Sequence, residues 1–215
     1  MNTKKLTTMA MLCALAYIIM LVGRFPISSV DFLNYDPKDI IITIGGFIYG
    51  PAAALLMSVV VSAVEMVTVS TTGIIGFIMN IVQTCSFACT AAFVYKKKHT
   101  LNGAVRGLVA GCILTVTVML LWNYFLTPLY MGMPREAVAE MLMPVFLPFN
   151  VIKGGINVAL TILLYKHVVT ALRKADLIPQ SDSSAPAKNS THMLIAAVLL
   201  FAVCIIWIFI NRGIL

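Results

Sequence analysis

The stretch FNVIKGGINVALTILLYKHVV, residues Phe149–Val169, shows what class of protein this chain belongs to. Its side chains are mostly apolar, and about 20 such residues are enough for a helix to cross the hydrocarbon core of a membrane. Asn150, Lys153 and Asn157 interrupt it at positions i, i+3 and i+7, a spacing that places them on one helical face. The stretch therefore predicts a membrane-spanning helix with one polar face.

The rest of the chain has the same character. Of its 215 residues 60% are hydrophobic and only 11% are charged, whereas a soluble domain has roughly 25% charged residues. This composition excludes a water-soluble fold and predicts an all-α membrane protein of six or seven transmembrane helices. The five cysteines all lie in apolar segments, where a thiol behaves as a small hydrophobe, so they predict neither disulfides nor a metal site.

Turn-forming residues and charges divide the chain into apolar segments. Thr127-Pro128 is expected to end the fifth helix, and Pro134, Pro144 and Pro148 are expected to bracket a short amphipathic helix before the sixth. The predicted helices are Leu6–Gly23, a short Ile40–Gly50, Ala52–Val69, Ile74–Tyr95, Leu101–Leu126, Phe149–Val169 and Met193–Ile210.

This division predicts a membrane domain of six helices over residues 1–174, a flexible cytoplasmic linker over 175–192 and an additional C-terminal transmembrane helix over 193–215. The last helix contains no ionisable group in Met193–Ile210, so we expect nothing to tie it to a polar pocket. The polar loop Arg24–Asp39 is about sixteen residues long, and loops of that length are usually functional.

The basic residues indicate the orientation in the membrane. With the N-terminus in the cytoplasm, ten of them fall on cytoplasmic connections and four outside, as the positive-inside rule requires. This distribution explains the net charge of +7 without a nucleic-acid partner, and it places the C-terminus outside the cell. The cytoplasmic set is Lys4, Lys5, Lys96, Lys97, Lys98, Arg106, Lys166, Arg173, Lys174 and Lys188.

Polar residues inside the spans predict a pocket. An ionisable group in a span costs about 2.5 to 3.5 kcal/mol on insertion scales, so each one is a candidate for a functional role. Glu65, Asn80, Asn123 and Lys153 lie on four different spans at a similar depth in the outer half of the membrane. Hydrogen bonding between helices is the alternative reading for any one of them. Together they predict a polar ligand pocket open to the outside.

The chain carries no sign of catalysis or of its own energy source. No G-x-x-x-x-G-K-[ST] stretch is present, so it cannot hydrolyse ATP by a P-loop. No nucleophile with a base, and no cluster of metal ligands, lies at membrane depth. A self-powered secondary transporter usually shows an internal repeat, and we find none. We therefore expect neither an enzyme nor a self-powered transporter.

Four segments in order resemble the riboflavin-specific S-components of energy-coupling-factor (ECF) vitamin transporters. These segments are FLNYDPKD (32–39), GFIYGP (46–51), NYFLTPLY (123–130) and PFNVIKG (148–154). The resemblance covers residues 7 to about 172. It implies a six-helix substrate-binding subunit that captures a vitamin from outside, with the loop after the first helix as a lid. The seventh helix departs from this six-helix pattern.

The resemblance also implies the partners. Transport in that family requires a transmembrane coupling subunit and two ATPase subunits, which agrees with the missing P-loop. The segment Ala10-Met11-Leu12-Cys13-Ala14 matches the family's A-x-x-x-A patch, which docks on the coupling subunit. No cofactor is expected, because riboflavin is the bound substrate.

The edge of the flavin ring presents an acceptor, a donor and an acceptor in a row, which lysine and amide side chains can match. Another flat heterocyclic vitamin is the first alternative ligand, and a membrane protein with a structural or assembly role is the second alternative. Nearby aromatic residues suit stacking on a planar ligand or an interfacial belt; these are Tyr35, Phe77, Tyr124, Phe125, Tyr130 and Phe149. The predicted substrate-binding residues are Lys153, Asn123, Asn157, Glu65, Asn80, Tyr124, Tyr35 and Asn150.

Overall fold

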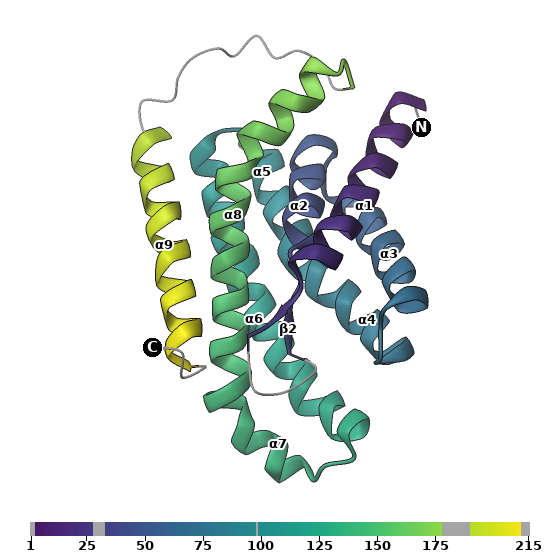
Figure 1. The fold of residues 1–215 in the computed structure, drawn as a ribbon, viewed down its shortest axis with the longest axis vertical. Coiled ribbons are helices and arrows are strands. Elements are labelled where there is room, and N and C mark those ends of the chain that lie inside the picture. The colour runs from purple at the N-terminus through teal and green to yellow at the C-terminus, as the bar shows by residue number, and fades with distance from the viewer. Residues whose placement is uncertain (1–2, 28–32, 98, 178–189, 212–215) are drawn as a thin grey trace.

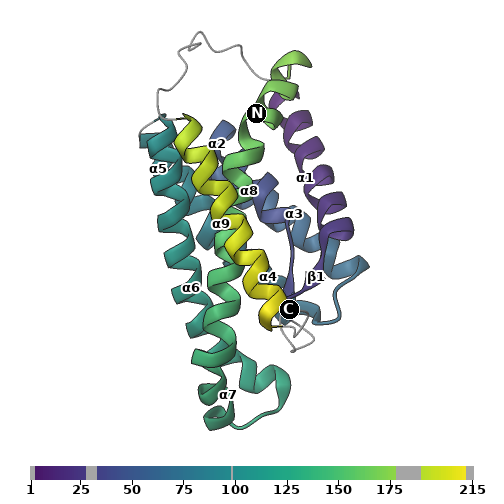
Figure 2. The same ribbon diagram turned by 60° about the vertical axis from the view of Figure 1, so that its left-hand side comes forward.

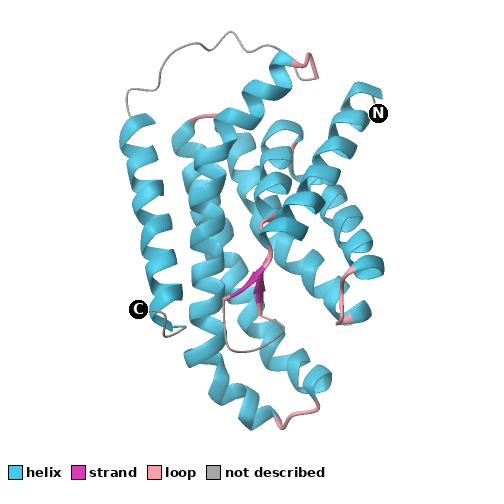
Figure 3. Ribbon diagram, viewed as in Figure 1, coloured by secondary structure: helices cyan, strands magenta, loops and turns pink. Residues whose placement is uncertain are grey.

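The computed structural model describes residues 3–27, 33–97, 99–177 and 190–211. They form a bundle of helices around one short strand pair (Figures 1 and 3). The elements are α1 Thr3–Gly23, β1 Phe25–Pro26, β2 Asn34–Tyr35, α2 Lys38–Tyr49, α3 Pro51–Thr68, α4 Gly73–Thr84, the π-helical turn η1 Cys85–Cys89, α5 Thr90–Lys97, α6 Leu101–Met131, α7 Arg135–Met141, the π-helical turn η2 Leu142–Phe146, α8 Leu147–Lys174 and α9 Ser190–Asn211.

Among the described residues, six helical segments are long and apolar enough to cross a membrane. The predicted all-α membrane fold is therefore confirmed, with α4, η1 and α5 forming one span. The 12-residue α2 is about 18 Å long, too short to cross a core of about 30 Å. The six segments are Thr3–Gly23, Pro51–Thr68, Gly73–Lys97, Leu101–Leu129, Arg135–Lys174 and Thr191–Asn211.

The short helix α2 lies at the centre of the bundle. Its residues are buried from Lys38 to Phe47, which agrees with a sequence that is apolar on every side. Gly46 lets neighbouring helices approach closely, since a Cβ atom there would lie 3.0 Å from the Cβ of Ala54 and 3.1 Å from that of Ala92. Gly50, at φ 93°, turns the chain sharply into α3. Because α2 begins inside the bundle, the residues just before it are carried inside as well.

Two predicted helix ends are wrong. Thr127-Pro128 does not end the fifth helix: α6 continues to Met131 and ends where Gly132 adopts a left-handed conformation, at φ 63°. A proline this close to the end removes only one of the last backbone hydrogen bonds. Pro144 lies in the π-helical turn η2, and Pro148 lies in the first turn of α8, where its missing N–H costs little. Residues 135–174 are therefore continuously helical instead of being divided by these prolines.

The additional helix α9 is confirmed and lies along α8 at the edge of the bundle (Figure 2). Most of its side chains face outward, but Cys204 and Ile208 are buried in a cluster with Tyr35, Phe149 and Ile156. This contact corrects the expectation that nothing ties the helix to the pocket region. Most of the predicted linker, residues 178–189, lies outside the described residues.

The two ends of the bundle differ in charge. The start of α1, the end of α5 and the end of α8 lie at one end (Figure 1). We call it the basic end; its described lysines are Lys4, Lys5, Lys96, Lys97, Lys166 and Lys174. The helix α7 lies at the opposite end (Figure 1). The strand pair and the polar side chains described next lie towards that opposite end.

Candidate functional site: a polar pocket beneath a β-hairpin

A short hairpin leads the chain from α1 into the bundle. Phe25 of β1 pairs with Tyr35 of β2 in antiparallel register, and their rings lie 5.2 Å apart. The chain then passes through Asp36 and Pro37 to the start of α2. Although this region reads as a polar surface loop, Asp36 is only 5% exposed and Lys38 only 1%. The segment therefore places charged side chains at the middle of a membrane protein, where each needs partners.

Asp39 is the anchor of this segment. Its carboxylate accepts hydrogen bonds from Thr84 Oγ1 at 2.6 Å, Asn157 Nδ2 at 3.2 Å and Gln83 Nε2 at 3.3 Å. Tyr35 in turn donates its hydroxyl to Asn157 Oδ1 at 2.9 Å. The carboxylate also lies in the first turn of α2, where the helix dipole favours a negative charge. These bonds connect the hairpin and α2 to both α4 and α8.

A chain of ion pairs lies beside this anchor. Lys153 Nζ is 3.7 Å from Asp36 Oδ2, and Arg24 lies 3.4 Å from Asp36 Oδ1 and 3.6 Å from Glu65 Oε1. Glu65 also pairs with the buried Lys38. The charges of Lys153 and Arg24 compensate the buried carboxylate of Asp36. The network thus joins the hairpin segment, α2, α3 and α8 through compensated charges.

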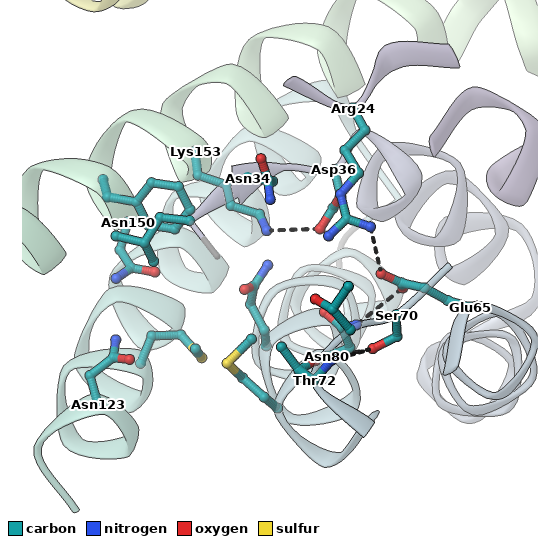
Figure 4. Close-up of a pocket in the computed structure, with 16 residues that line it drawn as sticks. Arg24, Asn34, Asp36, Glu65, Ser70, Thr72, Asn80, Asn123, Asn150 and Lys153 are labelled. Atoms are coloured by element: carbon teal, nitrogen blue, oxygen red, sulfur yellow. Dashed lines mark hydrogen bonds and ion pairs between the residues drawn. The ribbon is translucent and has the colours of Figure 1, made fainter. Parts of the chain in front are cut away.

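These charged groups form one side of a cavity (Figure 4). The cavity encloses about 640 Å³ of empty space, counting its open mouth. Amide groups and apolar side chains form the other sides. The lining residues are Arg24, Leu33, Asn34, Asp36, Glu65, Ser70, Thr71, Thr72, Met79, Asn80, Gln83, Met119, Asn123, Phe149, Asn150 and Lys153.

The structure brings five of the eight predicted site residues together at this cavity. They come from α3, α4, α6 and α8, as the common depth of these positions predicted. All five are buried, with at most 8% of each residue exposed. The five are Glu65, Asn80, Asn123, Asn150 and Lys153.

The other three predicted residues do not line the cavity. Tyr35 and Asn157 are buried and bonded to each other, where they support Asp39. Tyr124 is half-buried and contacts Phe125 and the guanidinium of Arg135 instead. Of the aromatic residues considered for stacking, Phe149 lines the cavity, with Lys153 Nζ 5.8 Å from its ring centre. Phe77 and Phe125 lie elsewhere, and the side chain of Tyr130 lies outside the described part of the chain.

Sequence reasoning missed the charged residues of the hairpin segment. All four charged residues were assigned to an outer loop, but Arg24 and Asp36 line the cavity. Lys38 and Asp39 are buried and bonded to two lining residues, Glu65 and Gln83. A signal for their burial was present. An apolar helix of about twelve residues cannot cross the membrane, so its first residues must lie inside the bundle.

The cavity combines apolar surface with hydrogen-bonding groups. Apolar contact surface comes from Met79, Met119, Leu33 and Phe149; the flexible methionine side chain fills irregular gaps and makes favourable contacts with aromatic rings. The amides of Asn80 and Asn123 offer both donors and acceptors, and Lys153 offers a charged donor. Asn80 Nδ2 donates to Glu65 Oε2 at 3.1 Å, and Asn150 Nδ2 donates to the carbonyl of Phe146 at 2.7 Å. These bonds fix the orientation of both asparagine amides and therefore of their side-chain carbonyl oxygens. The site is built for hydrogen bonding and shape recognition.

Comparison with known proteins agrees with this geometry. The family model described as "ECF transporter, substrate-specific component" matches residues 4–165, about three quarters of the chain. The chain belongs to this family. It is therefore a substrate-binding component of a membrane transporter and not an enzyme.

Individual relatives show how far the likeness extends. The chain is 30% identical over 180 residues to the riboflavin transporter RibU of Staphylococcus aureus (strain TCH60), covering 80% of this chain and 94% of that protein. It is 29% identical over 164 residues to the riboflavin transporter FmnP of Bacillus subtilis (strain 168), covering 72% and 86%. A solved structure titled "Structure and mechanism of the S component of a bacterial ECF transporter" matches with a TM-score of 0.68 and 30% identity, over 80% of this chain and 99% of that one. The helix α9 lies beyond the residues that the family model matches.

Proposed function

We propose that this S-component captures riboflavin from outside the cell, for uptake driven by partner ATPase subunits. The observation that carries the proposal is the cavity that joins Lys153, Asn123 and Asn80 from three helices. Relatives at about 30% identity are named riboflavin transporters. Membrane orientation supports capture from outside, because the basic end is expected in the cytoplasm and the cavity lies towards the other end.

Lys153 and Asn123 are proposed to recognise the polar edge of the flavin ring. A lysine donates to a carbonyl oxygen, and an asparagine both donates and accepts, which fits the acceptor, donor and acceptor of that edge. Lys153 Nζ lies 3.7 Å from Asp36 Oδ2. A flavin carbonyl that accepts a hydrogen bond from Lys153 is added to this ion pair and does not replace Asp36, so neither charge is left unpaired. Phe149 and the two methionines of the cavity supply contact with the ring. Asn150 and Glu65 complete the polar set.

Purification provides the first test. Protein that binds riboflavin should emerge yellow, with a flavin absorption spectrum, or should quench the fluorescence of added riboflavin in a saturable way. Saturation with a different flat heterocyclic vitamin instead would keep the S-component role and replace the substrate. If no vitamin binds saturably, a structural or assembly role becomes the better account.

Ala10 and Ala14 are proposed to dock on the transmembrane coupling subunit. Both are exposed and one helical turn apart on α1, and two methyl-sized side chains let another helix approach closely. Replacing both with Trp should abolish riboflavin uptake in cells that supply the coupling and ATPase subunits. Riboflavin binding to the purified double variant should remain intact, because neither residue lines the cavity. Normal uptake by this variant would show that the two alanines only face lipid.

A further inference from the structure

The two longest helices of the C-terminal region diverge at the basic end of the bundle. Figures 1 and 2 both show the end of α8 leaning away from the start of α9. A cleft of about 900 Å³, counting its open side, lies where they separate. Leu163, Ala171 and Leu194 are among its lining residues, and Leu194 belongs to the second turn of α9. The cleft is distinct from the polar pocket, because the two share no lining residue.

Polar and basic side chains line the same cleft. Lys166, His167, Thr170 and Lys174 all come from α8. His167, Thr170 and Lys174 follow Leu163 at i+4, i+7 and i+11, so they form one stripe along the helix. All four are exposed, and within the described part of the chain neither lysine has an ion-pair partner. The cleft therefore combines free positive charge with apolar surface.

We infer that this cleft binds an anionic phospholipid. Its basic side chains lie at the end of a transmembrane bundle, where phosphate head groups lie, and basic pockets between transmembrane helices are known to hold such head groups. The two ammonium groups carry the charge opposite to that of a lipid phosphate, and the apolar side chains beside them complement the first carbons of an acyl chain. The N-terminal end of α9 borders the cleft, and the dipole of a helix favours an anion there. No acidic residue occurs in the first turn of α9.

The site depends on α9, the helix that lies beyond the family match. All lining residues except Leu163 follow residue 165, where the match ends. A lipid in the cleft would fill the space between α8 and α9 and connect the added helix to the membrane surface. The inference goes beyond vitamin capture and requires neither riboflavin nor a coupling subunit.

The test uses the purified full-length protein in mild detergent and native mass spectrometry. Dioleoyl-phosphatidylglycerol and dioleoyl-phosphatidylcholine are added in equal amounts, and the bound lipid is identified by its mass. We expect phosphatidylglycerol to be retained preferentially. Lys166→Gln with Lys174→Gln should weaken its binding by about 30-fold, since each basic side chain near a lipid phosphate contributes about fivefold.

The matched control is Lys96→Gln with Lys97→Gln, which removes the same charge at the same end but outside the cleft. It should change lipid binding by less than about twofold. A second variant, Ala171→Trp, keeps every charge and fills the cleft, and it should also displace the lipid. The proposed lipid site would be overturned if the cleft pair and the control pair lost phosphatidylglycerol binding equally, or if Ala171→Trp retained the lipid fully.

A small-anion arm separates a lipid from a free phosphate. Inorganic phosphate or glycerol 3-phosphate at the same concentration as the lipid should not displace phosphatidylglycerol, because neither contacts the apolar wall. Displacement by either would mean that the cleft binds small anions and not a lipid. Riboflavin binding to the same variants should stay within about twofold of wild type, so failure of this site and failure of vitamin capture give different results.

Discussion

The polar pocket and the contact between α8 and α9 are held together by different forces. At the pocket, the charged residues Arg24, Asp36 and Glu65 each have two or more partners, and Asp39 alone accepts three side-chain hydrogen bonds. At the outer seam, α9 contributes apolar side chains such as Cys204 and Ile208. In lipid, apolar burial gives little net stabilisation, because lipid tails are as apolar as the helix.

This difference predicts which parts of the structure should be destabilised most by mutation. A charged residue inside the membrane must keep all its partners, since an unpaired one costs several kcal/mol. An apolar peripheral helix can exchange protein contacts for lipid contacts at small cost. The pocket should therefore depend strongly on single residues, whereas α9 should be removable.

The largest effect is expected at Asp39. Asp39→Ala leaves the donors of Gln83, Thr84 and Asn157 without their acceptor and removes a negative charge beside Lys38. We expect a loss of about 3 kcal/mol or more in the free energy of unfolding, as for a broken buried charge network. Thermal unfolding in detergent, followed by circular dichroism, would measure it. Glu140→Ala, which removes an exposed carboxylate on the helix α7, is the control and should unfold like wild type. An unchanged melting temperature for Asp39→Ala would show that the network does not anchor α2.

Removal of α9 should have a small effect on the pocket. No described residue of α9 lines the cavity, although Cys204 and Ile208 lie in the cluster behind it. Truncation after Lys174 should leave the riboflavin affinity within about twofold, because lipid replaces the lost contacts. Fluorescence titration of both forms would check this. A folded truncated protein that no longer binds riboflavin would show that α9 is part of the site.

The position of the C-terminus should show whether α9 crosses the membrane. The helix has 22 residues, about 33 Å, and it follows the basic end of α8. The positive-inside rule therefore places its far end outside. Accessibility of a reporter fused after Leu215 would measure this, and we expect it to be extracellular. A cytoplasmic reporter would mean that α9 lies on the membrane or that the orientation is reversed.

Periodicity and polarity in the sequence predicted most of the helices. The polar faces around Glu65, Asn80, Asn123 and Lys153 met at one cavity because ionisable and amide groups in lipid must face the bundle interior. The ends of α6 and α8 were predicted less well. Their prolines are tolerated in a last turn, a first turn and a π-helical turn, which residue type alone does not distinguish.

The hairpin segment was the main failure, and its cause is physical. A run of charges next to turn residues is typical of a surface loop, and only long-range pairing makes its burial possible. Lys38 and Glu65 are 27 residues apart, and Asp39 and Asn157 are 118 apart. Such pairs depend on how helices are arranged in space, so local sequence patterns do not reveal them. The docking role of Ala10 and Ala14 stays a prediction.

The most direct test of the account is riboflavin affinity in two lysine variants of the same helix. Lys153→Ala removes the charged donor of the cavity, whereas Lys166→Ala removes an exposed lysine about 20 Å further along α8. Fluorescence titration of the purified proteins should show that Lys153→Ala weakens binding at least about tenfold, or about 1.4 kcal/mol, while Lys166→Ala binds like wild type. Unchanged affinity in a folded Lys153→Ala protein would contradict the proposal that this cavity is the riboflavin site.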